Sequence, residues 1–280
     1  MAERDQVHES LRQWSAVAPA WEASRQRLFE NLRSVSEWLI DHVRPEAGQT
    51  ILELTAGPGE TGFLAASRLG PTGRLISSDF VPAMVEAAKR GAAERGLDNV
   101  ECRVIDSTDI DLPDASVDGV LSRFGLMLIP AQDQAMREIR RVLRPGGRFA
   151  YATWGPPERN PWIFRLVAAL LQHGWGPPGD PMAPGGIFSL ATGDSTRELA
   201  AGAGFTDASV EELEGLMRFE DPDDYWTMST SIAGPVAEFA ASLSDGQVDA
   251  IRATLDPSLA PFERDGALEL PWLSVATSVA

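Results

Sequence analysis

The sequence predicts an α/β fold built on a doubly wound, mostly parallel β-sheet with helices on both faces. From residue 50 onward, short apolar runs alternate with segments of helical periodicity, and this alternation is typical of βαβ units. The first apolar run leads into a glycine-rich turn that opens a helix. Because the crossovers of such units are almost always right-handed, the alternation restricts the topology to a doubly wound sheet.

Residues 1–44 are predicted to form helices that precede the sheet. Leu28, Leu32, Val35 and Leu39 recur at spacings of three and four residues, so they lie on one face of a helix. The next segment, 45–154, is predicted to form the ligand-binding core. Its strands are expected at 50–54, 74–79, 100–106, 117–124 and 148–154. Its helices are expected at 63–69, 82–96 and 132–143.

Residues 155–280 are predicted to supply a helical cap and the last two strands of the same sheet. The segment up to residue 186 is rich in glycine and proline, so its regular structure must be short. Ser195 and Glu198 have the spacing of a capping box, which predicts a helix that ends near Gly204. Pro271, within the last predicted strand, indicates an edge or a bulge. The two strands are expected at 206–215 and 267–279, separated by helical residues 221–259.

The composition of the chain argues against several classes of partner. Lysine and arginine number 24 against 41 aspartates and glutamates, which gives a net charge of −17. A chain this acidic repels phosphates, so we expect neither nucleic acid nor an anionic membrane as a partner. No secretory signal and no apolar run of ~20 residues are visible, so we expect a cytoplasmic protein. The single Cys102 and three scattered histidines predict no metal site.

Gly57, Gly59 and Gly62 form a G-x-G-x-x-G pattern directly after the first predicted strand. Asp79 ends the next strand 79 − 59 = 20 residues after Gly59, which matches the pattern of dinucleotide-binding sheets. An NAD(P)-dependent oxidoreductase is therefore one interpretation. The pattern is weak alone, because any such sheet that binds a nucleoside needs a tight glycine turn and a carboxylate for the ribose.

Three features favour a cationic nucleoside over a dinucleotide. Glu53 lies four residues before the first glycine of the turn, where its charge would repel a pyrophosphate but attract an ammonium or a sulfonium. Asp106 and Ser107 follow the third strand, where a carboxylate acceptor and a backbone N–H donor can form hydrogen bonds to the edge of an adenine. The only lysine, Lys89, has Val85 four residues before it, so a Tyr-x-x-x-Lys oxidoreductase pair is impossible.

Four segments resemble the successive motifs of class I S-adenosylmethionine-dependent methyltransferases. They are ILELTAGPG, LISSDFVPAMVEAAK, VIDSTDIDLPDASVDGVLS and REIRRVLRPGGRFAYATW, and they most resemble the group that contains the ubiquinone and menaquinone C-methyltransferases. The resemblance covers residues 50–154 well and the remainder loosely. It implies a Rossmann-like sheet of seven strands whose last strand, 266–279, is antiparallel. It also implies S-adenosylmethionine as the cofactor and S-adenosylhomocysteine as its product.

The resemblance further implies where the parts of the cofactor are held. Glu53 and the glycine loop would hold the methionine part, and Asp79 would accept from both ribose hydroxyls. The adenine would lie beside Phe80 and pair with Asp106 and the Ser107 backbone. Arg123 would lie near the methionine end of the cofactor or near the methyl acceptor. The complete set is Glu53, Thr55, Ala56, Gly57, Gly59, Asp79, Phe80, Asp106, Ser107 and Arg123.

Thr55 departs from the family pattern, which usually has glycine at this place. The threonine must tolerate a backbone angle that a β-branched residue resists, and its hydroxyl could bond the cofactor. Pro58 stiffens the middle of the same loop. The loop is therefore expected to follow a slightly different path from that of its relatives.

The sequence does not identify the methyl acceptor. Methyl transfer from a sulfonium depends mainly on positioning and exclusion of water, so no catalytic residue is assigned. Tryptophans and phenylalanines in the cap favour a small hydrophobic or aromatic acceptor, methylated at carbon or oxygen. Residues 1–44, 155–192 and 221–259 are expected to form a lid over it. A catalytically silent relative that acts as a partner subunit, and a homodimer, both stay open.

Overall fold

The structure is a computed structural model that describes residues 2–176 and 179–280. Met1 and the Pro177–Pro178 pair, which belong to the predicted N-terminal helices and cap, lie outside the described residues. The parallel strands are β1 Thr50–Leu54, β2 Arg74–Asp79, β3 Val100–Val104, β4 Val117–Arg123 and β5 Leu143–Trp154. The later strands are β6 Ser209–Phe219, β7 Glu263–Arg264 and β8 Ala267–Val279.

These strands form one sheet with the order β3-β2-β1-β4-β5-β8-β6. The first five strands pair in parallel, whereas β8 is antiparallel to both β5 and β6. The predicted doubly wound sheet of seven strands with an antiparallel last strand is therefore confirmed. The two-residue β7, which pairs with β8, was not predicted.

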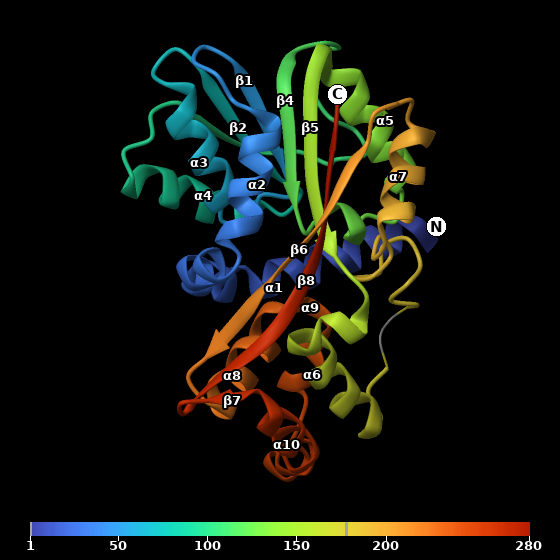
Figure 1. Ribbon diagram of the computed structural model, residues 1–280. Helices are drawn as coiled ribbons and strands as arrows, with labels where there is room; N and C mark the ends of the chain where they lie inside the picture. Colours follow the sequence, from blue (N-terminus) through green and yellow to red (C-terminus); the bar gives the residue numbers. More distant parts are fainter. Residues whose placement is uncertain (1, 177–178) are drawn as a thin grey trace.

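Helices cover both faces of the sheet (Figure 1). The N-terminal helices are α1 Ala2–Asn31 and α2 Arg33–Val43, and the core helices are α3 Glu60–Leu69, α4 Pro82–Glu94 and α5 Gln132–Val142. The later helices are α6 Pro161–Gln172, α7 Gly193–Gly202, α8 Pro222–Ile232, α9 Gly234–Ala241 and α10 Asp245–Leu259. α2, α3 and α4 pack together on one face, and α5 and α7 pack on the other. Ile51, Leu52, Val120 and Leu121 are fully buried between these layers, as expected for central parallel strands.

β6 and β8 extend past the end of β5 as a two-stranded ribbon, and the helices around this extension, α6, α8, α9 and α10, are called the cap below (Figure 1). β5 pairs with β8 only as far as Trp154 and Ser274, whereas β6 stays paired with β8 as far as Leu268. Pro271 lies in the part of β8 beyond β5, where its missing N–H removes no hydrogen bond of the central sheet, so the edge that the proline predicted is confirmed. The ribbon passes the carboxyl end of β5, and α6 and α8 pack near it.

The start of α7 differs from the prediction. The capping box is formed by Thr192 and Ser195, because the Thr192 side chain accepts from the Ser195 N–H and the helix begins at Gly193. The predicted box of Ser195 and Glu198 was therefore wrong by one turn. Thr192 has an extended backbone and a suitable side chain, so it competes successfully for the cap position. The helix ends at Gly202, close to the predicted end.

Candidate active site

The ten predicted site residues all lie at the carboxyl ends of four neighbouring parallel strands. The loop 55–59 follows β1, Asp79 ends β2, Asp106 follows β3 and Arg123 ends β4. The strand order reverses between β1 and β4, and ligands of doubly wound sheets bind in the crevice at this switch point. The fold therefore brings residues that are up to 70 positions apart (123 − 53 = 70) to one edge of the sheet.

The glycine loop leaves room for a ligand at one of its glycines and is tightly packed at the other. Gly57 has a φ of 55°, and a side chain added to it would meet no atom within 4 Å. Gly59 has a φ of 90°, and a Cβ there would lie 2.7 Å from the Phe63 ring. The Ala56 N–H donates to the Ser78 carbonyl at 2.9 Å, which fixes the loop to β2. The open side of Gly57 is where a ligand can approach the backbone.

The Asp79 carboxylate can accept further hydrogen bonds. Its carboxylate accepts from the Gly57 N–H and from the Val81 N–H, both at 2.9 Å, and the residue is 7% exposed. A carboxylate has about four lone-pair sites, and the Phe80 N–H also faces this one, so about one or two are left for hydroxyls. Burial raises the pKa of Asp79 to about 6. Phe80, which follows, is half-buried and packs in a small cluster with Trp14 and Trp21 of α1.

Glu53 is the most deeply buried acid of the site. It is 2% exposed and accepts from the Gly62 N–H at 2.8 Å and from the Ser77 hydroxyl at 2.9 Å. A side chain at Gly62 would lie 2.1 Å from a Glu53 oxygen, so the third glycine of the pattern makes room for this carboxyl group. Burial raises the pKa of Glu53 to about 8, against the opposing charge of Arg123. Glu53 is therefore mostly protonated at neutral pH, and a bound cation would favour its ionisation.

Arg123 ends β4, near enough to Glu53 for the two charges to interact. Its Nη1 donates to the Ser36 hydroxyl of α2 at 3.0 Å, and Ser36 in turn pairs with the Thr61 hydroxyl at 3.0 Å. Within the described residues, no carboxylate lies within 4.0 Å of the Arg123 guanidinium. Burial lowers the pKa of Arg123 to about 10. A guanidinium has five N–H donors, so Arg123 keeps several for an anionic group of a ligand.

Thr55 and Phe124 both have left-handed backbones at this switch point. Thr55 has a φ of 54°, as its sequence position predicted, and its hydroxyl bonds the Leu54 carbonyl at 2.5 Å and the Ser122 hydroxyl at 2.8 Å. Phe124 has a φ of 59°. Its ring stacks on Trp154 with the centroids 3.7 Å apart, and Trp162 meets Trp154 edge-on at 5.2 Å.

We call Phe124, Trp154 and Trp162 the aromatic group. It lies at the ends of β4 and β5, where α6 of the cap begins. The prediction of a hydrophobic or aromatic acceptor relied on tryptophans and phenylalanines of the cap, and it did not include Phe124 of the core. Only its place directly after Arg123 could have indicated it, because its contact with Trp154 joins residues 30 positions apart (154 − 124 = 30).

Asp106 and Ser107 form a compact turn after β3. The Asp106 Oδ1 accepts from both the backbone N–H and the hydroxyl of Thr108 at 2.8 Å. The second carboxylate oxygen has no partner among the described residues, and Asp106 is exposed, whereas Ser107 is 5% exposed. The turn therefore presents a free carboxylate oxygen at the outer end of the site.

Comparison with known proteins identifies the family. A family model described as a methyltransferase domain matches residues 45–170. The nocamycin O-methyltransferase of Saccharothrix syringae is 36% identical over 225 residues, which cover 71% of this chain and 78% of that protein. The chain is a class I S-adenosylmethionine-dependent methyltransferase. The ubiquinone/menaquinone biosynthesis C-methyltransferase UbiE of Hahella chejuensis is 30% identical over 180 residues, which cover 59% of this chain and 72% of that one.

Solved structures agree with this fold. The YcgJ protein from Bacillus subtilis has a TM-score of 0.56 and 18% identity, over 88% of this chain and 98% of that one. A SAM-dependent methyltransferase from Aquifex aeolicus has a TM-score of 0.52 and 19% identity, over 69% of this chain and 92% of that one. The cofactor of this methyltransferase is S-adenosylmethionine, and the oxidoreductase interpretation of the glycine pattern receives no support.

Helix α1 joins the methyltransferase core to the cap (Figure 1). On the core side, Arg25 pairs with Glu60 of α3 at 3.4 Å. On the cap side, the Trp21 indole donates to the Ile232 carbonyl at 2.7 Å, and Arg27 forms an ion pair with Asp224. These bonds place α1 beside Phe80 and against α8, so it adjoins both the predicted adenine position and the cap.

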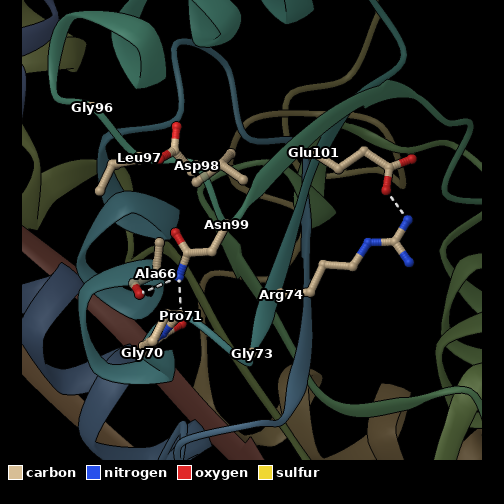
Figure 2. A pocket seen from close by; sticks show the side chains of 11 residues that line it. Ala66, Gly70, Pro71, Gly73, Arg74, Gly96, Leu97, Asp98, Asn99 and Glu101 are labelled. Atoms are coloured by element: carbon tan, nitrogen blue, oxygen red, sulfur yellow. Dashed lines mark hydrogen bonds and ion pairs between the residues drawn. The ribbon is translucent and has the colours of Figure 1, made fainter.

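A pocket of about 620 Å³ lies at the opposite edge of the sheet (Figure 2). It opens at the amino ends of β2 and β3, beside Arg74 and Glu101, which form an ion pair. Asn99 lines it and donates to the carbonyls of Ala66 and Gly70 at the end of α3. The pocket therefore lies away from the predicted site.

His173 lies at the far end of α6 from the aromatic group and pairs with Thr254 at 2.8 Å. Within residues 2–176 and 179–280, no group of His, Cys, Asp and Glu has a metal-binding arrangement. Over the same ranges, the structure has no helix with the length and apolar character that a membrane crossing requires.

Proposed function

We propose that the residues at the carboxyl edge of β1 to β4 hold S-adenosylmethionine as the sequence predicted. Asp79 would bind the ribose hydroxyls with its unused lone pairs, and the open side of Gly57 would admit the ligand to the loop. The turn at Asp106 and Ser107 would face the adenine. One observation carries the proposal: several residues with unused hydrogen-bond donors and acceptors lie together at a single switch point of the sheet.

The methionine part of the cofactor fits the inner end of the site. It carries an ammonium, a carboxylate and a sulfonium, and the site offers the Glu53 carboxyl group and the spare donors of Arg123. The cofactor supplies a methyl group already activated on sulfur. The protein would orient its two ends, and the buried setting of Glu53 strengthens any contact with a cationic group.

The acceptor we propose is a small hydrophobic or aromatic molecule, methylated at carbon or oxygen. The aromatic group supports this, because its Phe124 ring stacks on Trp154 on one face and is only half-buried. Planar acceptors stack favourably on such rings. Relatives named as a nocamycin O-methyltransferase and a quinone C-methyltransferase act on small molecules, and together they include both kinds of methylation.

The lid over this acceptor would be formed by residues 1–44, 155–192 and 221–259. This is supported by the contacts of α1, which forms an ion pair with Glu60 of the core and a hydrogen bond to the Ile232 carbonyl of the cap. The cap helices α6 and α8 are joined by Tyr225, whose hydroxyl donates to the Trp162 carbonyl at 2.8 Å. A lid of this kind would exclude water from the methyl transfer.

Calorimetry with S-adenosylhomocysteine tests the cofactor assignment. The variant Asp79→Asn should bind the ligand at least about tenfold more weakly, because a charged acceptor of two hydroxyls is lost. The matched control is Asp98→Asn at the opposite edge of the sheet, which should bind as the wild type does. Equal affinity for wild type and Asp79→Asn would contradict the assignment, as would binding of NAD in its place. A panel of small phenols and quinones then tests the acceptor class.

A further inference from the structure

Thr55 packs against Gly125, which lies in the turn after a different strand, β4. If Gly125 carried a side chain, its Cβ would lie 2.0 Å from the Thr55 hydroxyl and 2.2 Å from the Thr55 Cβ. Gly125 has a φ of −114° and a ψ of −35°, angles that any residue adopts. The glycine is therefore required for space and not for its backbone freedom, and the group that fills the space is Thr55.

The Thr55 hydroxyl also links two strand ends. It donates its single proton to the Leu54 carbonyl at 2.5 Å, so in the pair with Ser122 at 2.8 Å the proton comes from Ser122. Ser122 is 2% exposed and belongs to β4. The side chain of Thr55 thus connects the last residue of β1 and the cofactor loop to β4 and to the turn at Phe124 and Gly125.

The left-handed backbone of Thr55 is unfavourable for a threonine, so a structural reason for this residue is expected. Glycine would adopt a φ of 54° without the steric cost that a β-branched residue meets. Residues held in such conformations persist only where their surroundings fix them, and they cluster at binding sites. Here the surroundings that fix Thr55 are Ser122 and Gly125.

We propose that Thr55 is a positioning residue that holds the cofactor loop in its binding conformation by tying it to the Phe124–Gly125 turn. The proposal rests on the proposed cofactor site. The hydroxyl acts on the protein and not on the cofactor, in contrast to the role suggested by the sequence. Because Phe124 belongs to this turn and Arg123 directly precedes it, Thr55 also fixes the loop relative to the aromatic group proposed to contact the acceptor.

Variants of Thr55 measure the effect on binding separately from stability. Thr55→Gly frees the loop and should weaken binding of S-adenosylhomocysteine roughly fivefold. Its melting temperature should fall by no more than about 5 °C, since relief of the backbone offsets the lost hydrogen bond. Thr55→Ser keeps the hydroxyl and should bind within about twofold of the wild type. Ala115→Gly relieves a φ of 50° on an exposed turn and serves as the control, with unchanged affinity.

A double-mutant cycle tests the contact itself. Gly125→Ala should lower the melting temperature and weaken binding in the wild type, because the new methyl group overlaps Thr55. In the Thr55→Gly background the same substitution should be nearly neutral for the melting temperature. Wild-type affinity in Thr55→Gly, or equal harm from Gly125→Ala in both backgrounds, would overturn the proposal. A wild type that does not bind S-adenosylhomocysteine would instead overturn the cofactor site on which the proposal rests.

Discussion

Replacing Glu53 by glutamine should change how the stability of the protein depends on pH. Glutamine keeps an oxygen that accepts from the Gly62 N–H and an amide that can pair with the Ser77 hydroxyl, so the packing is preserved. What is lost is the titrating proton. The charges that face this group are Arg123, which lowers its pKa, and Asp79, which raises it, and desolvation by burial exceeds both.

The magnitude follows from the pKa of about 8, against an ordinary value of 4.5. Since the folded protein holds the Glu53 proton more tightly, this stabilisation is complete below pH 4.5 and is lost as the pH rises toward 8. Between pH 5.5 and 7.5 the loss amounts to about 2.5 kcal/mol, or about 5 °C in melting temperature for a chain of this size. Asp79, with a pKa of about 6, adds a loss of the same sign at lower pH.

Thermal unfolding of the two proteins across this pH range gives the result. The wild type should lose about 5 °C more than Glu53→Gln between pH 5.5 and 7.5, while an exposed control, Glu46→Gln, should follow the wild type. Calorimetry at pH 7 in buffers of different ionisation enthalpy should also detect release of up to about 0.9 proton per bound S-adenosylmethionine. Glu53→Gln should release none from this site. Parallel curves for wild type and Glu53→Gln would refute the reasoning, because Glu53 would then be ionised throughout.

Two further substitutions probe the packing of the site and of the cap. Gly62→Ala should lower the melting temperature by about 5 °C and abolish S-adenosylhomocysteine binding, because the new methyl group overlaps the Glu53 carboxyl group. Gly202→Ala, where a Cβ meets no atom within 4 Å, should be neutral, and equal effects of the two would contradict the role of Gly62. Tyr225→Phe should cost about 1–2 kcal/mol, measured by denaturant unfolding, with cofactor affinity unchanged. Weaker cofactor binding in that variant would show that the cap acts on the cofactor site.

The sequence predicted the positions of those candidate site residues that depend on local order along the chain. Each strand could be recognised from a short apolar run, and parallel strands necessarily bring their carboxyl ends to one edge. Asp79 and Asp106 follow from this rule, because each ends or follows a strand, whereas Arg123 was implied by the resemblance to the methyltransferase family. The left-handed backbone of Thr55 was expected because the family usually has glycine at this place.

The features that the sequence did not predict depend on contacts between distant segments. The match of Thr55 to Gly125 joins residues 70 positions apart (125 − 55 = 70), and no local pattern marks it. The protonation of Glu53 depends on its burial beneath Gly62 and beside Ser77, which only the packed structure reveals. The predicted N-cap residue of α7 was wrong because Thr192 and Ser195 compete for this position, and their backbone angles decide between them.

The protonation of Glu53 also revises the argument that first pointed to a cationic ligand. The sequence suggested a standing negative charge that attracts a sulfonium, but burial keeps this carboxyl group mostly neutral at pH 7 until a cation arrives. Burial also lowers the pKa of Arg123 to about 10 and raises the pKa of Asp79 to about 6, and both groups stay mostly charged at pH 7. A ligand that carries an ammonium, a carboxylate and two hydroxyls would offset the cost of burying the charged forms of all three groups. At the proposed cofactor site, this complementarity would favour such a zwitterionic nucleoside over a diphosphate without a net negative charge in the empty site.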